Sequence, residues 1–314
     1  MYYPYFRGKQ YELITIRESS KLLADSQFVP IIEPVKESTS GLERAVSEVS
    51  QAGGECILVV NPKCGSHCED SKAIRSLVKT VFANFAGLSA GILLTSAMSA
   101  TDAKTLCDQQ ANRPVTLVHY GFEDGRVLAE ALADCPNVTR HVFVDGFCTK
   151  LYRRHFLNNT RILLKDGFKK RDSNRDYPNH ESFSDLHVTF EDEGMNGFGD
   201  FLVVGKDFSE YGGPAYAVAI HLTYIDEQKD NEMFIYHFLS ERINTPTDPA
   251  GKFAEAVSKL ATEVEKDNSP ILRSLAVQEF LDLHRTHHFP GLGYVKKLSM
   301  QHHIETLADY VTRS

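Results

Sequence analysis

The sequence predicts an α/β fold, a distorted TIM-like (β/α)8 barrel followed by a C-terminal helical extension. Short runs rich in Val, Ile and Leu recur along the chain, and the early runs are almost continuously apolar. This is the pattern of strands buried on both faces of a parallel sheet. Segments with the apolar spacing of amphipathic helices separate these early runs. Strands that alternate with helices favour a barrel, with an open doubly wound sheet as the alternative.

Eight apolar runs are the candidate strands. They are 28–35, 56–60, 91–95, 115–120, 141–145, 161–166, 200–205 and 215–225. The pattern weakens after residue 166, because a long polar stretch precedes the seventh run and the connection to the eighth is too short for a crossover helix. The eighth run continues into 233–239, which predicts an antiparallel hairpin. We therefore expect a distorted barrel or a barrel-like mixed sheet.

Helices are predicted from the amino terminus onward. An amphipathic helix that begins between Arg7 and Glu12 is placed to close the bottom of the barrel. Thr101 or Asp102 is the expected N-cap of a helix after the third strand. Further helices between the early strands are expected at 41–52, 71–86 and 125–134.

The last part of the chain reads as helical. Amphipathic helices are expected at 250–265, 270–284 and 299–313, and the Pro- and Gly-containing stretch 287–297 is expected to be a linker. These boundaries predict a barrel-like α/β domain over residues 1–245 and a helical segment over 246–314 that packs on it.

Composition narrows the class of protein. The chain of 314 residues is 42% hydrophobic and 24% charged, as globular domains are, and its net charge is −8. An acidic balance argues against a general nucleic-acid coat, although the basic stretch 168–177 leaves a local contact with nucleic acid open. The scattered cysteines favour reduced thiols, and neither a membrane-spanning run nor a signal peptide is found. We expect a cytoplasmic protein without a membrane partner.

Polar and ionisable residues lie at the carboxyl ends of most of the predicted strands. Functional sites in barrels and open α/β sheets form at the carboxyl ends of strands, so the residues at these ends are the candidates. No metal ligands are assigned, because the Cys and His residues of 63–68 lack a second pair of ligands, and the cofactor is left open. The candidate catalytic residues are Glu33, His119, Asp145 and Lys165, and the candidate ligand-binding residues are Lys36, Asn61, Asp207 and His221.

These residues have two interpretations, a polar pocket or a set of ion pairs. Unpaired charge near a core is costly, so Glu33 with Lys36, or Asp145 with Lys165, is expected to balance charge. In a pocket, His119 is the natural proton carrier near neutral pH.

Three stretches carry a family resemblance. Residues 1–18, MYYPYFRGKQYELITIRE, together with GFGDF at 197–201 and VAIHLTY at 218–224, resemble blocks of a bacterial family that opens Met-Tyr-aromatic-Pro-Tyr and continues Arg-Gly-Lys-Gln. That family is similar, more distantly, to the phage beta-protein-like family. The resemblance brings no established reaction and therefore transfers no catalytic residue. The neighbourhoods with which this family is associated imply a bacterial conflict or phage-defence setting.

Two functions from different classes are consistent with these observations. The first is a barrel hydrolase that acts by acid–base chemistry on a phosphorylated or nucleotide-like small molecule. The alternative is a non-catalytic barrel scaffold that binds a partner protein, or a second copy of itself, through the C-terminal helices and the hairpin near 226–239. The scaffold predicts an exposed apolar patch over 253–283.

Overall fold

The computed structural model describes all residues except 211–212, 214 and 314. The chain forms two compact units. The first comprises Met1–Asp166 with Thr189–Phe201, and the second comprises Gly167–Val188 with Leu202–Ser314. The domain boundary expected between residues 245 and 246 lies inside the second unit, because the sheet that contains the predicted hairpin belongs to the same unit as the C-terminal helices.

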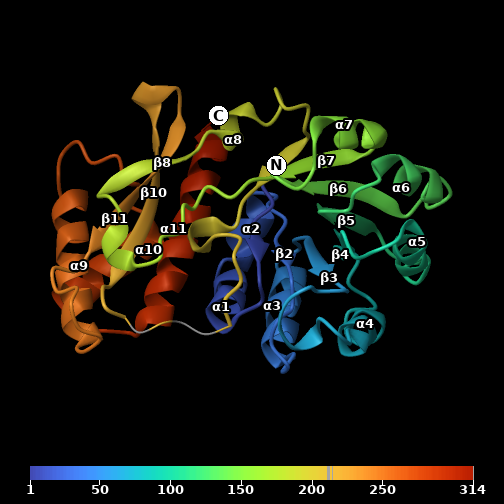
Figure 1. Cartoon of the computed structure of the whole chain (residues 1–314). Helices are drawn as coiled ribbons and strands as arrows, with labels where there is room; N and C mark the ends of the chain where they lie inside the picture. Colours follow the sequence, from blue (N-terminus) through green and yellow to red (C-terminus); the bar gives the residue numbers. More distant parts are fainter. Residues whose placement is uncertain (211–212, 214, 314) are drawn as a thin grey trace. The chain divides into compact units, whose positions relative to one another are not determined.

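A parallel eight-stranded sheet forms the first unit (Figure 1). A parallel bridge between Tyr2 and Phe198 joins its last strand back to the chain beside its first, and the amide of Tyr5 donates to the carbonyl of Asp200 at 2.9 Å. The sheet thus comes round on itself, which confirms the predicted (β/α)8 barrel. Its strands lie in the order β1 (Tyr5–Phe6), β2 (Ile31–Ile32), β3 (Cys56–Val59), β4 (Leu88–Thr95), β5 (Val115–Tyr120), β6 (Val138–Val144), β7 (Thr160–Leu164) and β9 (Gly197–Gly199).

Helices alternate with these strands. The predicted helix over 41–52 is confirmed, whereas the one after β3 ends at Lys79 rather than near residue 86. Ser99, rather than Thr101 or Asp102, caps the helix after β4. The helices are α1 (Gln10–Glu18), α2 (Ser20–Asp25), α3 (Ser40–Gln51), α4 (Lys72–Lys79), α5 (Ala100–Asp108), α6 (Gly125–Ala131), α7 (Lys150–Arg153) and α8 (Leu186–Thr189), with 3-10 turns η1 (Gly65–His67) and η2 (Arg154–Phe156).

Three strand assignments are corrected by the structure. β1 has no counterpart among the predicted strands, because two residues are too few to show a period. The run 200–205 contains the 3-10 turn η4 (Leu202–Val204), and the eighth barrel strand is β9 just before it. A side chain at Gly199 would overlap the carbonyl oxygen of Tyr3, so glycine is needed where β9 approaches the amino terminus. The run 215–225 belongs to the sheet of the second unit.

The barrel interior is a packed core. Side chains alternate between the two faces of a strand, so Val118 inside places His119 on the outer face, and Leu164 inside does the same for Lys165. This alternation decides which strand-end residues lie at the carboxyl end of the interior. The inner cluster consists of Tyr3, Tyr5, Val29, Ile31, Ile57, Val59, Leu93, Val118, Val142, Val144, Ile162, Leu164 and Phe201.

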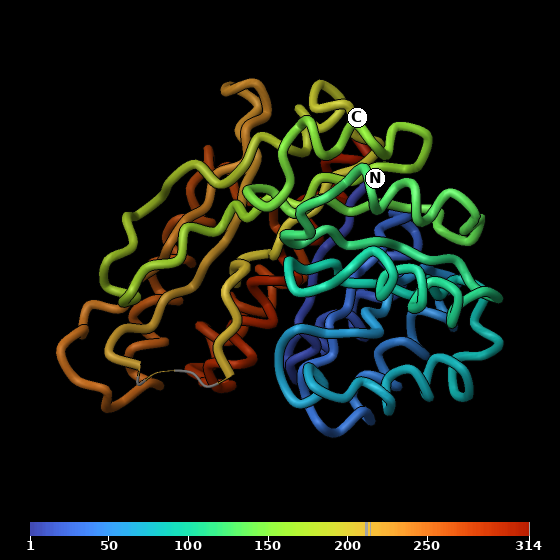
Figure 2. Tube along the Cα trace, turned by 45° about the vertical axis from the view of Figure 1, so that its right-hand side comes forward, coloured from blue at the N-terminus to red at the C-terminus, as the bar shows by residue number. Residues whose placement is uncertain are grey.

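An antiparallel sheet is the centre of the second unit. Its strand order is β10 (Ala219–Asp226), β11 (Glu232–Leu239) and β8 (His180–Ser184), with 3-10 turns η3 (Asn174–Asp176) and η5 (Glu227–Lys229) nearby. The predicted hairpin is confirmed as β10–β11. Figure 2 shows the segment 167–188 running beside the hairpin, where β8 pairs with β11.

The C-terminal helices pack on this sheet. They are α9 (Pro249–Val264), α10 (Leu275–Arg285) and α11 (Leu292–Arg313). The linker predicted over 287–297 is shorter than expected, because α11 begins directly after Gly291, whose φ is +91°. None of the helices in the described part of the chain combines the length and apolarity that crossing a membrane requires.

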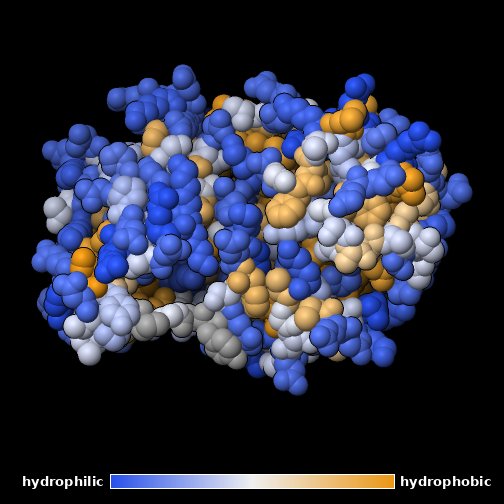
Figure 3. All heavy atoms as spheres, viewed as in Figure 1, coloured by the Kyte–Doolittle hydropathy of each residue, from blue (hydrophilic) through white to orange (hydrophobic). Residues whose placement is uncertain are grey.

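One apolar core joins the sheet to these helices. It includes Ile220 of β10, Phe253 of α9, Phe280 of α10 and other buried side chains. In the fully described range 253–283 the large apolar side chains are buried or half-buried apart from Leu275, which is 74% exposed, so the range presents no apolar patch. Mostly hydrophilic side chains cover the second unit on the face that Figure 3 shows.

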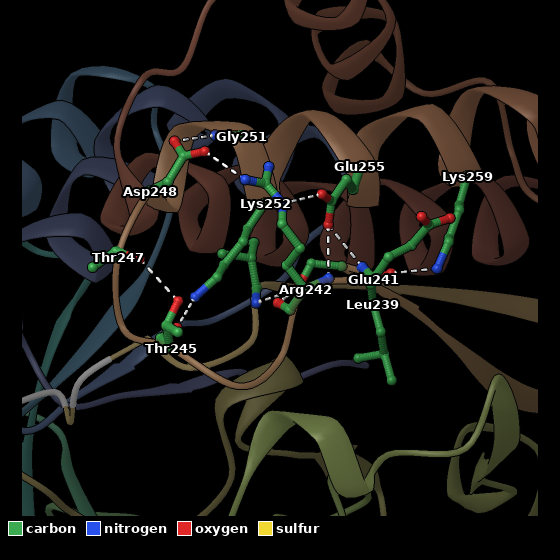
Figure 4. A network of polar contacts seen from close by, with 12 residues as sticks. Leu239, Glu241, Arg242, Thr245, Thr247, Asp248, Gly251, Lys252, Glu255 and Lys259 are labelled. Atoms are coloured by element: carbon green, nitrogen blue, oxygen red, sulfur yellow. Dashed lines mark hydrogen bonds and ion pairs between the residues drawn. The ribbon is translucent and has the colours of Figure 1, made fainter.

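A buried lysine ties the segment after β11 to the start of α9 (Figure 4). Lys252 is 1% exposed, and its ammonium donates to the carbonyl of Ala215 at 2.9 Å and to the carbonyl of Thr245. Beside it, Glu255 accepts hydrogen bonds from the backbone amide and the guanidinium of Arg242. These contacts hold the loop between β11 and α9 against the helix.

Lys252→Met is expected to lower the free energy of unfolding by about 1–3 kcal/mol, because methionine fills similar space but leaves the carbonyl oxygens of Ala215 and Thr245 without the donor that a buried ammonium supplies. Lys259→Met is the matched control. Lys259 is exposed on the same helix and donates to the carbonyl of Leu239 at 2.8 Å, where water replaces it readily. Urea denaturation followed by circular dichroism measures both, and equal stability of the two variants would contradict this role.

Candidate site at the carboxyl ends of the barrel strands

Glu33 lies at the carboxyl end of the barrel interior, as the sequence predicts. Its side chain is 1% exposed and accepts hydrogen bonds from the hydroxyl of Tyr5 at 2.8 Å and from the backbone amide of Lys63 at 2.9 Å. The Nε of Arg7 lies 3.9 Å from the same carboxylate. Glu33, which follows β2, is therefore held from the two neighbouring strands, by Tyr5 in β1, Arg7 just after it and Lys63 after β3.

The turn after β1 brings Arg7 to this carboxylate. Gly8 adopts a φ of +57°, and a Cβ there would lie 3.0 Å from the carbonyl oxygen of Glu33. A larger residue is therefore disfavoured both by the backbone conformation and by the close contact. The backbone amide of Arg7 donates to the carboxylate of Glu12, in the first turn of α1. The predicted amphipathic helix thus anchors the end of β1 by means of its own acid.

Tyr5 remains a phenol at neutral pH in this arrangement. Burial raises its pKa well above the ordinary value of 10.0, and the neighbouring carboxylate of Glu33 raises it further. Tyr5 consequently donates a hydrogen bond to Glu33 and keeps its proton. The Arg7 guanidinium packs 5.4 Å from the centre of the Phe201 ring. The buried part of the site combines one carboxylate, one guanidinium and one neutral phenol.

A cation and aromatic rings lie closer to solvent at the same end. Lys63 is exposed, and its Nζ lies 3.3 Å from the centre of the Tyr120 ring. The rings of Tyr120 and Phe147 are 4.3 Å apart, and Phe147 is 39% exposed. Because the backbone amide of Lys63 also donates to Glu33, this residue connects the exposed and buried parts of the site.

Asn61 has a structural contact with the neighbouring strand. Its amide nitrogen donates to the carbonyl of Leu93 at 2.9 Å, and its amide oxygen accepts from the amide of Leu93 at 2.8 Å. The side chain therefore continues the hydrogen bonding between β3 and β4 past the end of β3. Lys36 is exposed, and its carbonyl lies 2.9 Å from Nε2 of His67, which fastens η1 to the loop after β2.

His119 does not lie with Glu33. It is fully buried on the outer face of β5, where its Nδ1 is 2.7 Å from the hydroxyl of Tyr152 and its Nε2 is 2.9 Å from Nδ1 of His141. Burial and the neighbouring His141 hold the pKa of His119 well below its usual 6.5. The predicted proton carrier is instead a neutral residue of the layer between the barrel wall and its helices.

Asp145 and Lys165 also follow strand positions on the outer face. Asp145 is exposed, and Nη2 of Arg153 in α7 lies 3.7 Å from its carboxylate. Lys165 is half-buried, and its backbone amide donates to the carbonyl of Gly199 at 3.0 Å. Neither residue is brought to Glu33.

The remaining two candidates belong to the second unit. Asp207 is exposed in the segment that follows η4. His221 lies on β10, and its Nδ1 is 2.7 Å from Nδ1 of His237 on β11. The strand-end rule does not apply to either of them, because the runs that contain them are not barrel strands.

Four residues that the structure places with Glu33 at this end of the barrel are absent from the sequence-derived catalytic and ligand-binding candidates: Tyr5, Arg7, Lys63 and Tyr120. Tyr5 lies in the two-residue strand that no period reveals. Lys63 stands two positions beyond Asn61, where the alternation of β3 continues past the last paired residue. Counting every second residue past the strand ends would have found Lys63.

These observations define a TIM-type barrel with a polar cluster of Arg7, Glu33, Lys63, Tyr5 and Tyr120 at the carboxyl ends of its strands. Among the described residues, no group of three or more His, Cys, Asp or Glu side chains is arranged to hold a metal ion. No protein-family model matches the chain, and no curated protein matches it in sequence.

Proposed function

We propose that the barrel binds a phosphorylated or nucleotide-like small molecule at the carboxyl ends of its strands and hydrolyses it. The observation that supports this proposal most strongly is the placement of Lys63. Its ammonium sits on the Tyr120 ring near solvent, while its backbone amide binds the buried carboxylate of Glu33. One residue thereby places a cation, an aromatic surface and an acid–base group next to one another.

The charges and rings suit an anionic ligand with a planar group. Arg7 and Lys63 carry positive charges beside the carboxylates of Glu33 and Glu12, and cations of these types bind phosphate. The Tyr120 and Phe147 rings offer an apolar face to a base, because stacking on aromatic side chains is a common mode of nucleotide recognition. In the proposal, the phosphate displaces the ammonium of Lys63 from the ring and the base replaces it there.

Glu33 is the proton acceptor in this proposal. It already accepts a hydrogen bond from the Tyr5 hydroxyl, and burial together with Glu33 raises the pKa of Tyr5 so that this residue stays a phenol. In hydrolysis, the carboxylate takes a proton from the attacking water, and the neutral phenol of Tyr5 supplies one to the leaving oxygen. The guanidinium of Arg7 beside Glu33 stabilises negative charge that develops on the phosphoryl group.

The scaffold alternative and the biological setting remain predictions. The range 253–283 lacks the exposed apolar patch that a partner-binding surface on the C-terminal helices was expected to have. A conflict or phage-defence role rests only on the family resemblance of residues 1–18, 197–201 and 218–224.

Thermal unfolding with a panel of AMP, ADP, ATP and inorganic phosphate tests the binding step, and release of inorganic phosphate tests hydrolysis. A member of the panel is expected to raise the melting temperature of the wild type by mass action. Lys63→Gln is expected to weaken that binding about tenfold, which corresponds to about 1.4 kcal/mol. Tyr120→Leu is expected to weaken nucleotides more than inorganic phosphate, since only nucleotides have a base to stack.

Lys72→Gln is the matched control, because Lys72 is a solvent-exposed lysine of α4 whose carboxylate neighbour is Asp70. It is expected to bind like the wild type. If no member of the panel stabilises the wild type, or if Lys63→Gln and Lys72→Gln bind equally well, the proposed binding role of this cluster is wrong.

A further inference from the structure

Three titratable side chains from adjacent strands form a chain on one face of the sheet in the second unit. His221 of β10 stands directly opposite His237 of β11, and their Nδ1 atoms are 2.7 Å apart. Nε2 of His237 lies 3.3 Å from a carboxylate oxygen of Glu181 on β8. Glu181 is opposite Ile235, two residues before His237, so the alternation of strand side chains places all three on the same face.

Glu181 is the fixed end of this chain. Nη2 of Arg171 donates to both of its carboxylate oxygens, at 2.8 and 3.1 Å, and the ammonium of Lys169 is 3.6 Å away. A carboxylate only accepts hydrogen bonds, so Nε2 of His237 carries the proton between them. Burial lowers the pKa of His237 to about 4 despite the opposing effect of Glu181, so this imidazole is neutral at pH 7.

The tautomer of His221 follows from that of His237. A neutral His237 with its proton on Nε2 has a lone pair on Nδ1, so the short contact requires His221 to donate from its own Nδ1. Burial first, then His237 and Lys296, lower the pKa of His221 well below 6.5, so His221 is also neutral. The lone pair of His221 is therefore on Nε2, the ring nitrogen that does not contact His237.

Aromatic side chains hold the ring of His221 in place. The rings of Phe168 and Tyr177 meet it edge-on, with centres 5.0 and 4.9 Å away. His221 itself is half-buried, whereas His237 is buried. A neutral imidazole with a fixed tautomer, a fixed orientation and partial access to solvent has the arrangement of a general base that a hydrogen-bonded partner orients. Here His237 is that partner, and the carboxylate of Glu181 orients His237 in turn.

We infer that His221 is the proton acceptor of a second acid–base site, which takes a hydroxyl-bearing small molecule or an activated water. Nε2 of His221 accepts the proton of the hydroxyl, and the resulting imidazolium keeps its Nδ1 proton in the hydrogen bond to His237. The proton between His237 and Glu181 stays where it is, so a single proton moves from ligand to His221. This inference is independent of the function proposed for the barrel, because all of its residues belong to the second unit.

The tautomer of His221 tests the inference in the intact protein. Two-bond proton–nitrogen correlation spectra of the histidine rings at pH 7.5 are expected to show an unprotonated Nε2 and a protonated Nδ1 for His221. In His237→Phe the acceptor is lost, and the proton is expected to move to Nε2, the site that free imidazole side chains favour. His237→Gln keeps an acceptor oxygen and is expected to retain the wild-type tautomer.

Modification by diethyl pyrocarbonate, whose carbonyl carbon is attacked by the unprotonated ring nitrogen, gives a second measurement by mass spectrometry. His221 is expected to react several-fold more slowly in His237→Phe than in the wild type or in His237→Gln. The exposed His155 of η2 is the internal reference, and its rate is expected to stay constant. A proton on Nε2 of His221 in the wild type, or equal reactivity of His221 in all three proteins, would overturn the inference.

Discussion

Glu33→Ala is expected to lower the free energy of unfolding by about 3–5 kcal/mol, the range for breaking a buried ion pair by removing one partner. The substitution removes the carboxylate that balances the charge of Arg7 and the acceptor of the Tyr5 hydroxyl, all at the end of the packed barrel interior. It also removes the acceptor of the Lys63 amide, which ties the loop after β3 to β2. Urea denaturation followed by circular dichroism measures the loss, because the chain contains no tryptophan.

Glu37→Ala is the matched control, since Glu37 is exposed four residues further along the same loop. It is expected to change the free energy of unfolding by less than about 0.5 kcal/mol. Arg7→Met combined with Glu33→Ala is expected to cost less than the sum of the single variants, because the double variant removes both members of the ion pair and leaves neither of them unpaired. Additive losses would show that Arg7 and Glu33 do not act as a pair.

A decrease in stability as the pH falls from about 6.5 towards 4 is the second large expected effect. In the barrel wall, burial lowers the pKa of His141 to about 4 and holds that of His119 well below 6.5. Above pH 6.5 both residues are neutral in the folded and unfolded chains and contribute no pH dependence. Below pH 6.5, these histidines bind protons in the unfolded chain but stay neutral in the folded chain. The free energy of unfolding therefore falls by up to about 1.4 kcal/mol per pH unit for each proton.

The variant with both His119→Phe and His141→Phe is expected to reduce this pH dependence, while the lowered pKa values of His221 and His237 leave part of it in place. Phenylalanine preserves the stacking on Phe156, although the hydroxyl of Tyr152 loses its partner and the stability near neutral pH decreases. The slope between pH 6.5 and 4 is therefore the decisive quantity, and it is obtained from urea denaturation at several pH values. His155→Gln, at an exposed position, is expected to leave the slope unchanged, and an unchanged slope in the double variant would assign the acid sensitivity elsewhere.

Most of the fold was predictable because buried strands and helices have characteristic patterns of apolar residues in the local sequence. The continuous apolar runs of β3 to β7 and the helical spacing between them indicate strands covered on both faces. The hairpin β10–β11 was predictable for the same reason. The weak points are the shortest strands: β1 has two residues and β9 is Gly-Phe-Gly, so neither shows a period or a high apolar content.

The candidate site was predictable only in part. Glu33 was found because an acid at the end of an apolar strand is unusual, and the structure places it at the end of the barrel interior. His119 was misplaced because its strand is apolar on both faces, so the sequence does not reveal which residues face inward. A shift of one residue separates His119, in the outer layer, from Tyr120, beside Lys63.

By itself the sequence determined that this chain builds a parallel barrel, a hairpin and C-terminal helices, because each depends on local patterns of apolar residues. Only the tertiary structure decided which polar side chains meet. Pairing of β10, β11 and β8 brings His221, His237 and Glu181 together from positions far apart in the chain. Parallel pairing of β1, β2 and β3 does the same for Arg7, Glu33 and Lys63. The physical reason is that strand register and facing direction are set by long-range pairing, which no single stretch of sequence contains.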